Sequence, residues 1–269
     1  MELNKIYNED CLEGMKKMPD KSVDMILTSP PYDNLRDYKG FNFDFHNIAK
    51  EIYRIVKDGG VVVWVVGDAT FNGSESGTSF RQALYFMELG FKLHDTMIYE
   101  KNTSSFPSRR NSKRYTQIFE YMFVFSKGKI KTGNLICDKK NKWAGHTNWG
   151  VNTQRGKDGL LKETKKIKPV PKTSPRNNIW KYVVGGGFTT SNNISYKHPA
   201  TFPEKLAKDH ILTWSNEGEV VLDPFMGSGT TAVACVDTNR EYLGFEISEE
   251  YCEIAQERIN NHKDMLPNR

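Results

Sequence analysis

The sequence predicts an α/β protein with a doubly wound, mostly parallel sheet and an antiparallel hairpin at one edge. Short apolar runs alternate with segments whose apolar residues recur at helical spacing, which is typical of this class. The run Val61–Val66 is apolar throughout, as in a strand buried on both faces. Tyr121–Phe125 follows Lys92–Tyr99 with no helical pattern between them, so these two strands are expected to pair antiparallel.

The elements of the N-terminal half follow from the same patterns. The expected strands are Lys5–Asn8, Val23–Thr28, Val61–Val66, Lys92–Tyr99 and Tyr121–Phe125. The expected helices are Cys11–Met18, Ile48–Val56 and Ser79–Leu89. Asp58-Gly59-Gly60 is expected to end the second helix as a C-cap, and Gly90 the third.

The periodicity fails from about Lys127 to Ser195, where Lys, Asn, Gly, Pro and Thr dominate, and this favours an inserted recognition module. Regular patterns then return. The expected helices are Phe202–Trp214, Thr230–Asp237 and Glu249–Asn260, and the expected strands are Glu219–Leu222 and Tyr242–Glu246. The predicted organisation is therefore residues 1–126, an inserted region 127–195, and residues 196–269.

Composition places few limits on function. The 269 residues carry a net charge of +5, with Lys and Arg crowded between about Lys101 and Lys181. This is compatible with a polyanionic partner or with a solvated lysine-rich loop. No apolar run reaches the ~18 residues of a membrane span and no signal peptide is evident, so a cytoplasmic location is expected. The four cysteines form no C-x-x-C pair, and no metal site is predicted.

The most informative motif is Ser29-Pro30-Pro31-Tyr32, which directly follows the expected strand Val23–Thr28. It sets a hydroxyl, backbone carbonyls and a flat ring around one small volume. Proline has no N–H, so the rim of that volume is rich in acceptors. Such a volume suits an amino group on a planar heterocycle, although the tetrapeptide by itself is only a stiff turn.

A second motif runs from Asp223 to Thr231, between an expected strand and an expected helix. Gly227 and Gly229 allow a ligand to approach the backbone, and the helix N-terminus offers N–H donors. No Lys follows the second glycine, so this is not a Walker loop. Glu246 ends the next strand, where an acid can hold both hydroxyls of a ribose.

Together these motifs resemble the S-adenosylmethionine-dependent DNA methyltransferases that methylate exocyclic amines, in the permuted order called the β group. The resemblance covers about Asn8 to Arg258 and implies a Rossmann-like methyltransferase fold. It implies that residues 1–126 form the catalytic half, 196–269 the cofactor-binding half, and 127–195 the target-recognition region. Ser29, Pro30, Pro31 and Tyr32 match the catalytic motif of the family.

The resemblance also implies a set of residues that bind S-adenosylmethionine. Asp10 and Cys11 sit where the family places a carboxylate for the adenine amino group, and Lys197, His198 and Pro199 match the motif beside the methionine end. The other implied residues of the cofactor site are Asp223, Pro224, Phe225, Gly227, Ser228, Gly229, Thr230, Glu246 and Ile247.

Ser at the first position of the tetrad is usual in the cytosine-N4 enzymes of the family, whereas Asp or Asn is usual in the adenine-N6 enzymes. Ser29 therefore favours cytosine N4, with adenine N6 as the alternative. The base must leave the duplex before its amine can react. A DNA-binding protein without catalysis is the competing class.

Double-stranded DNA is the expected partner. The loop Ser104–Arg114 lies near the expected rim of the site, and its cations Arg109, Arg110, Lys113 and Arg114 are candidate phosphate contacts, although an ordinary basic loop would look the same. A homodimer and a companion restriction endonuclease are further expected partners, as in a restriction-modification system. An orphan or phage modification enzyme would lack the endonuclease.

Overall fold

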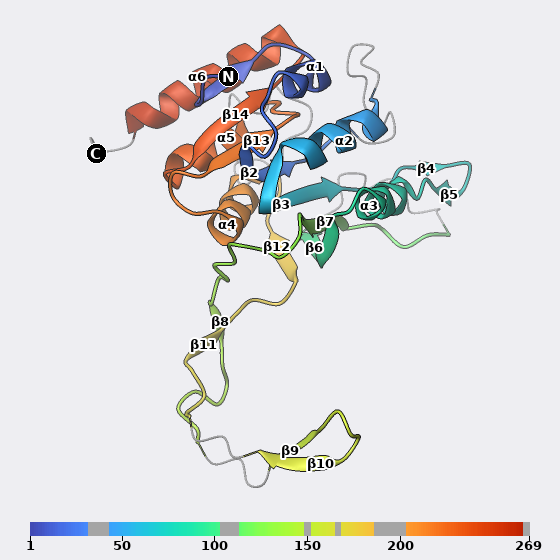
Figure 1. Cartoon of the computed structure of the whole chain (residues 1–269), viewed down its shortest axis with the longest axis vertical. Helices are drawn as coiled ribbons and strands as arrows, with labels where there is room; N and C mark the ends of the chain where they lie inside the picture. Colours follow the sequence, from blue (N-terminus) through green and yellow to red (C-terminus); the bar gives the residue numbers. More distant parts are fainter. Residues whose placement is uncertain (32–42, 103–112, 148–151, 165–167, 186–202, 266–269) are drawn as a thin grey trace. The chain divides into compact units, whose positions relative to one another are not determined.

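An 8-stranded sheet forms the centre of the computed structural model, which describes residues 1–31, 43–102, 113–147, 152–164, 168–185 and 203–265 (Figure 1). Its strands are β1 (Lys5–Tyr7), β2 (Val23–Thr28), β3 (Val56–Val66), β6 (Lys92–Lys101), β7 (Phe119–Ser126), β12 (Ile179–Tyr182), β13 (Val220–Asp223) and β14 (Glu241–Phe245). Their order in the sheet is β1-β14-β13-β2-β3-β7-β6-β12. A separate short hairpin joins β4 (Thr70–Phe71) to β5 (Ser74–Glu75).

The pairing confirms the predicted fold class. Strand β7 is antiparallel to both of its neighbours, β3 and β6, and the other pairs of the sheet are parallel. The antiparallel hairpin β6–β7 is not the last pair of the sheet, however. Strand β12 extends the sheet beyond β6 in parallel register, with Ile179 opposite Ile98. The sequence patterns missed β12 because it has only 4 residues and lies in a Lys- and Gly-rich context.

Helices cover both faces of the sheet. They are α1 (Cys11–Lys16), α2 (Phe45–Ile55), α3 (Thr78–Glu88), α4 (Glu204–Trp214), α5 (Thr230–Asp237) and α6 (Glu249–Met265). Helices α1, α2 and α3 pack in sequence, and their buried side chains join one apolar cluster with Trp64, Leu222 and Phe245 of the strands. Helices α4, α5 and α6 also pack in sequence, and α4 contacts β2.

The end of α2 differs from the prediction. The helix ends at Ile55, and Val56 is already extended (φ −70°, ψ 133°), so Asp58-Gly59-Gly60 is not its C-cap. These residues belong to β3, where the Gly59 N–H donates to the Lys127 carbonyl at 2.6 Å. The positive φ of Gly59 (81°) marks an irregular start of the strand rather than the end of a helix.

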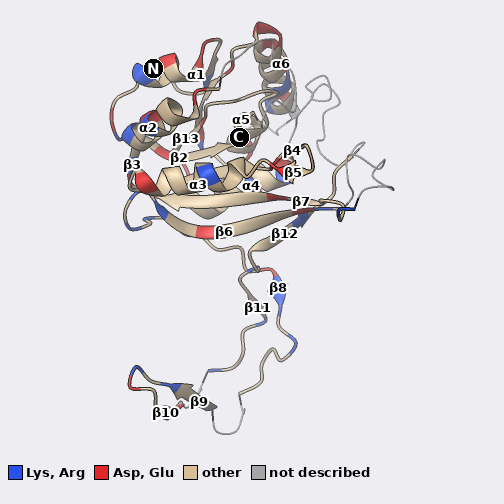
Figure 2. Ribbon diagram, turned by 90° about the vertical axis from the view of Figure 1, so that its right-hand side faces the viewer, with Lys and Arg blue, Asp and Glu red and all other residues tan. Residues whose placement is uncertain are grey.

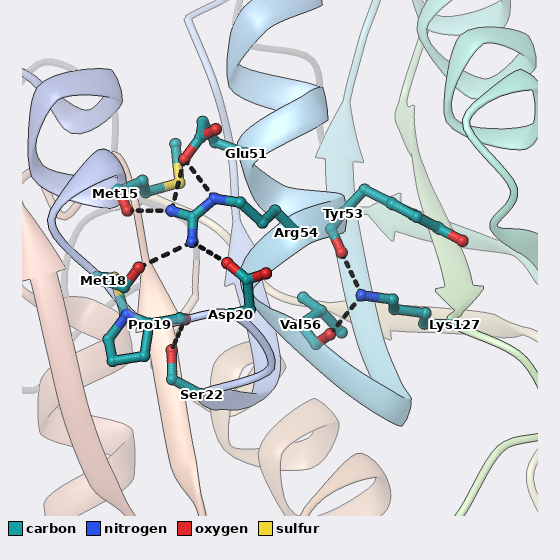
Figure 3. Close-up of polar contacts among 10 residues, drawn as sticks. All are labelled: Met15, Met18, Pro19, Asp20, Ser22, Glu51, Tyr53, Arg54, Val56 and Lys127. Atoms are coloured by element: carbon teal, nitrogen blue, oxygen red, sulfur yellow. Dashed lines mark hydrogen bonds and ion pairs between the residues drawn. The ribbon is translucent and has the colours of Figure 1, made fainter.

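Arg54 of α2 fixes the connection between α1 and β2 (Figure 3). Its guanidinium donates to the carbonyls of Met15 and Met18, at 2.7 and 2.8 Å. It also pairs with Asp20 at 2.6 Å and with Glu51 at 2.7 Å. The two carbonyls at the end of α1 thereby gain donors that the helix itself cannot supply. This arrangement holds the segment leading into β2, the strand that ends at the Ser29 motif.

The chain divides into two compact units. One contains residues Met1–Asn134 and Asn178–Arg269, and the other contains Leu135–Asn177. In the second unit β8 (Lys139–Lys140) pairs with β11 (Thr173–Ser174), and β9 (Asn152–Arg155) pairs with β10 (Leu161–Thr164). None of the described residues of this unit is buried, and Lys and Arg recur along it (Figure 2). The unit is shorter than the predicted inserted region 127–195 because β12 belongs to the main sheet.

Candidate functional site

The two motifs singled out in the sequence follow neighbouring strands. Leu222 of β13 lies opposite Ile26 of β2, which confirms that these distant segments pair in parallel. On its other side β13 pairs with β14, with Asp223 opposite Gly244. The carboxyl ends of parallel strands meet at one edge of a sheet, where α/β proteins bind their ligands. The Ser29 turn, the glycine turn and Glu246 therefore start from the same edge.

Asp223 connects these elements through its buried carboxylate. Its Oδ1 accepts from the Thr28 hydroxyl at 2.6 Å and from the Phe225 N–H at 3.0 Å. Its Oδ2 accepts from the Thr231 hydroxyl at 2.6 Å. Burial raises the pKa of Asp223 to about 6, against the lowering effect of these hydrogen bonds. Asp223 thus lies beneath the edge of the sheet and ties the catalytic strand to the glycine turn.

The glycine turn is fixed by its neighbours as well as by its own conformation. Gly227 and Gly229 both have positive φ, 52° and 81°. A Cβ at Gly229 would lie 3.0 Å from the Cβ of Ala255 in α6, so a side chain there would press on that helix. The Met226 N–H donates to the Phe245 carbonyl at 2.9 Å, which anchors the turn to the end of β14.

Arg258 of α6 supports the same turn from below, and sequence reasoning missed it. Its guanidinium is buried and donates to the Ser228 carbonyl at 2.8 Å and to the hydroxyls of Ser228 and Thr230, both at 3.1 Å. Its charge is paired with Glu204 of α4. A polar helical residue near the C-terminus gives no local signal of such a role, because its partners lie 28 to 54 residues away in the chain.

Glu246 lies at the end of β14 with its carboxylate next to the glycine turn. Oε2 accepts from the Gly227 N–H and Oε1 from the Ser248 N–H, both at 2.9 Å. Burial raises the pKa of Glu246, while these backbone donors favour the charged form. Each oxygen can accept a further hydrogen bond. The Ser248 hydroxyl beside it is buried and has no hydrogen-bond partner among the described residues.

Asp10 and Cys11 lie close to Glu246. The Asn8 side chain donates to the carbonyls of Glu246 and Ile247, both at 3.0 Å, so the ends of β1 and β14 are joined. Asp10 caps α1, since its Oδ1 accepts from the N–H groups of the second and third residues after it, at 2.9 and 3.1 Å. Burial raises the pKa of the Cys11 thiol, which is therefore not reactive.

The donor set at this edge fits one half of a nucleoside cofactor. A carboxylate with remaining acceptor capacity and a buried, unpaired Ser248 hydroxyl suit the two hydroxyls of a ribose. Ile247 is 50% exposed beside them and offers an apolar surface to a planar ring. The remaining predicted residues lie within the turn, but Phe225 points into the core and packs its ring against Trp64 and Phe43.

The Ser29 turn is described in part. Ser29 is half-buried and Pro30 is buried, directly after the buried strand β2. Tyr32 lies outside the described residues, as do Lys197, His198 and Pro199 and the cations Arg109 and Arg110. Lys113 is exposed, whereas Arg114 donates to the Gly73 carbonyl and lies 3.6 Å from Glu75. Its charge is therefore shared with the β4–β5 hairpin.

Comparison with known proteins identifies the class. The model of the N6/N4 methylase family, described as DNA methylase, matches residues 23–257, and the chain belongs to this family. Members use S-adenosylmethionine as the methyl donor. The chain is 56% identical to the orphan methyltransferase M.BamHII of Bacillus amyloliquefaciens, over 90% of this chain and 91% of that protein. It is 27% identical to the type II methyltransferase M.SmaI of Serratia marcescens, over 95% and 90% of the two chains.

Solved structures share the fold. The DNA modification methylase TTHA0409 of Thermus thermophilus, complexed with S-adenosyl-L-methionine, superposes with a TM-score of 0.66 at 24% identity, over 97% of this chain and 95% of that one. The cytosine-N4-specific PvuII DNA methyltransferase gives a TM-score of 0.67 at 20% identity, over 97% and 91%. These similarities confirm the Rossmann-like methyltransferase fold.

Within the part of the chain that the structure describes, no helix has the length and apolar character needed to cross a bilayer.

The buried Asp223 carboxylate predicts a pH-dependent difference between the parent protein and Asp223→Asn. The pKa of this group is 3.8 when exposed and about 6 when folded. Its contribution to stability is therefore full below about pH 4 and is lost as the pH rises through about 6. The free energy of unfolding of the parent minus that of the variant should fall between pH 4 and 7, by up to about 3 kcal/mol. Urea unfolding at several pH values measures this difference, and a pH-independent difference would contradict it.

Proposed function

We propose that this DNA methyltransferase transfers a methyl group from S-adenosylmethionine to the N4 amine of a cytosine that has been flipped out of duplex DNA. The observation that carries the proposal is that the Ser29 turn, the glycine turn and Glu246 start from one edge of the sheet and are joined through Asp223. The choice of cytosine rests on Ser29 as the first residue of the tetrad.

The cofactor-binding half of the crevice accounts for positioning of the methyl donor. Glu246 is proposed to accept hydrogen bonds from the ribose hydroxyls, with the Ser248 hydroxyl as an additional partner. Asp10 and Ile247 would hold the adenine, Asp10 through its second carboxylate oxygen and Ile247 by apolar contact. When bound, S-adenosylmethionine supplies an electrophilic methyl group on a sulfonium centre. Lys197, His198 and Pro199 stay predicted contacts for its methionine end.

The catalytic half accounts for positioning of the amine. The exocyclic amine of cytosine is a weak nucleophile, because its lone pair is conjugated with the ring. Ser29 Oγ and the Pro30 carbonyl are proposed to accept its two N–H groups, which orients the lone pair away from the ring plane. Tyr32 is proposed to stack on the extracted base. Most of the rate gain then comes from orientation of the reacting groups.

The same acceptors could orient the N6 amine of adenine, which makes adenine-N6 methylation the second candidate. The DNA adenine methyltransferase YhdJ of Escherichia coli is 25% identical to this chain over 96% of its length, so sequence similarity extends to an enzyme of that specificity. Membership of a restriction-modification system with an endonuclease partner, and a homodimeric state, are proposals that rest on the resemblance to the family.

Identification of the product tests the proposal. The purified protein is incubated with unmethylated bacterial DNA and methyl-labelled S-adenosylmethionine, and the DNA is digested to nucleosides for mass analysis. We expect N4-methylcytosine, and we expect Ser29→Ala to reduce its formation at least tenfold because one acceptor is lost. N6-methyladenine would move the assignment to the second candidate. No labelled nucleoside would contradict transfer to either base.

Glu246→Gln is expected to weaken cofactor binding by about tenfold, because an amide replaces one of two carboxylate acceptors with a donor. Calorimetric titration with S-adenosylmethionine measures the change. Glu249→Gln is the matched control, since Glu249 is exposed in the first turn of α6 and should bind the cofactor as the parent does. Equal affinity of the Glu246 and Glu249 variants would remove Glu246 from the cofactor site.

A further inference from the structure

The unit Leu135–Asn177 has a charge unlike the rest of the chain. It contains eleven Lys and Arg against three Asp and Glu, a net charge of +8, whereas the whole chain carries +5. The remaining residues are therefore net negative. The cations of the chain are concentrated in this one unit, where blue residues recur along both of its strand pairs (Figure 2). A surface of this charge fits a polyanion.

The same unit has no hydrophobic core among its described residues. None of them is buried, and its large apolar side chains are exposed: Leu135 56%, Trp143 53%, Leu160 67% and Leu161 64%. An isolated two-stranded ladder of this kind is only marginally stable in water. The unit is thus built to gain its apolar contacts from a partner.

Leu160 and Leu161 stand next to each other at the tip of the β9–β10 hairpin. The Gly156 N–H donates to the Leu160 carbonyl at 2.8 Å, and Leu161 lies opposite Arg155 in the ladder. Gly159, with φ 78°, closes the turn. This hairpin tip, Arg155–Lys162, therefore presents two adjacent aliphatic side chains that no described neighbour covers.

Cations surround the leucine pair. Arg155 donates to the Gly159 carbonyl at 2.8 Å, which leaves its charge at the tip. Lys162 pairs with Asp158 at 2.8 Å, and both partners are largely exposed. Lys157 adds a further positive charge, so the tip carries three cations and one carboxylate. Apolar side chains flanked by cations on a β-ribbon match the chemistry of duplex DNA, where bases are apolar and phosphates lie on either side.

We propose that the hairpin tip is a wedge that inserts Leu160 and Leu161 between base steps of duplex DNA. The cations Arg155, Lys157 and Lys162 contact the flanking phosphates. Insertion of an aliphatic side chain unstacks neighbouring bases and unwinds the helix locally. The inference rests on the proposed function, because its use is to help the target base leave the stack, but the binding event itself does not require methyl transfer.

Unwinding of closed circular DNA tests the wedge directly. A relaxed plasmid of unmethylated DNA is saturated with the protein, treated with topoisomerase I and deproteinised, and its linking number is read from a gel. We expect the parent to lower the linking number and L160S/L161S to lose most of this shift. L135S is the matched control, because it removes an exposed leucine of the same unit outside the hairpin, and it should unwind as the parent does.

Two binding measurements complete the experiment. K157Q should weaken duplex binding and reduce the slope of log K against log salt by about 1, since one phosphate contact is lost. Equal unwinding by the parent and L160S/L161S would overturn the wedge, as would a parent that binds without unwinding. A change of oligomeric state in L160S/L161S with unwinding intact would assign the leucines to a protein contact. Unwinding that depends on the leucines, without methyl transfer, would instead contradict the proposed function.

Discussion

The candidate site depends on one buried carboxylate that accepts hydrogen bonds from two walls of the crevice. Asp223 ends the strand β13, and its two oxygens bond Thr28 before the Ser29 turn and Thr231 at the start of α5. Burial of a charged group without such donors would cost several kcal/mol. The turns on either side are therefore held in fixed positions relative to each other, although about 195 residues separate them in the chain. A reaction that relies on alignment of two ligands needs this rigidity.

The fold could be read from the sequence where patterns are local. Buried strands such as Val61–Val66 and the amphipathic helices gave the class, and the pairing of β2 with β13 followed from the rule that ligand sites form where strand order reverses. The end of α2 could not be read correctly, because Gly59 and Gly60 resemble a helix stop but pair with Lys127 across the sheet. Only that distant partner decides between the two conformations.

The site shows the same division between local and distant information. Ser29, Gly227 and Glu246 stood out because their motifs are short and chemically unusual. Thr28 and Arg258 did not, although each contacts the machinery through the core. A threonine in a strand and an arginine in a helix are common, and their roles come from partners that only the folded chain brings near. The basic, coreless unit Leu135–Asn177 adds a contrasting part, whose order is expected to come from DNA.

The claim that Asp223 aligns the two walls is tested most directly by turnover of Thr28→Val. The variant keeps the volume of the buried side chain and removes its hydroxyl. We predict that kcat for DNA methylation falls at least tenfold while the affinity for S-adenosylmethionine stays within about threefold, and that Thr28→Ser restores kcat. Thr213→Val, a buried threonine bonded only within α4, should leave kcat unchanged. Parental kcat in Thr28→Val would contradict the account.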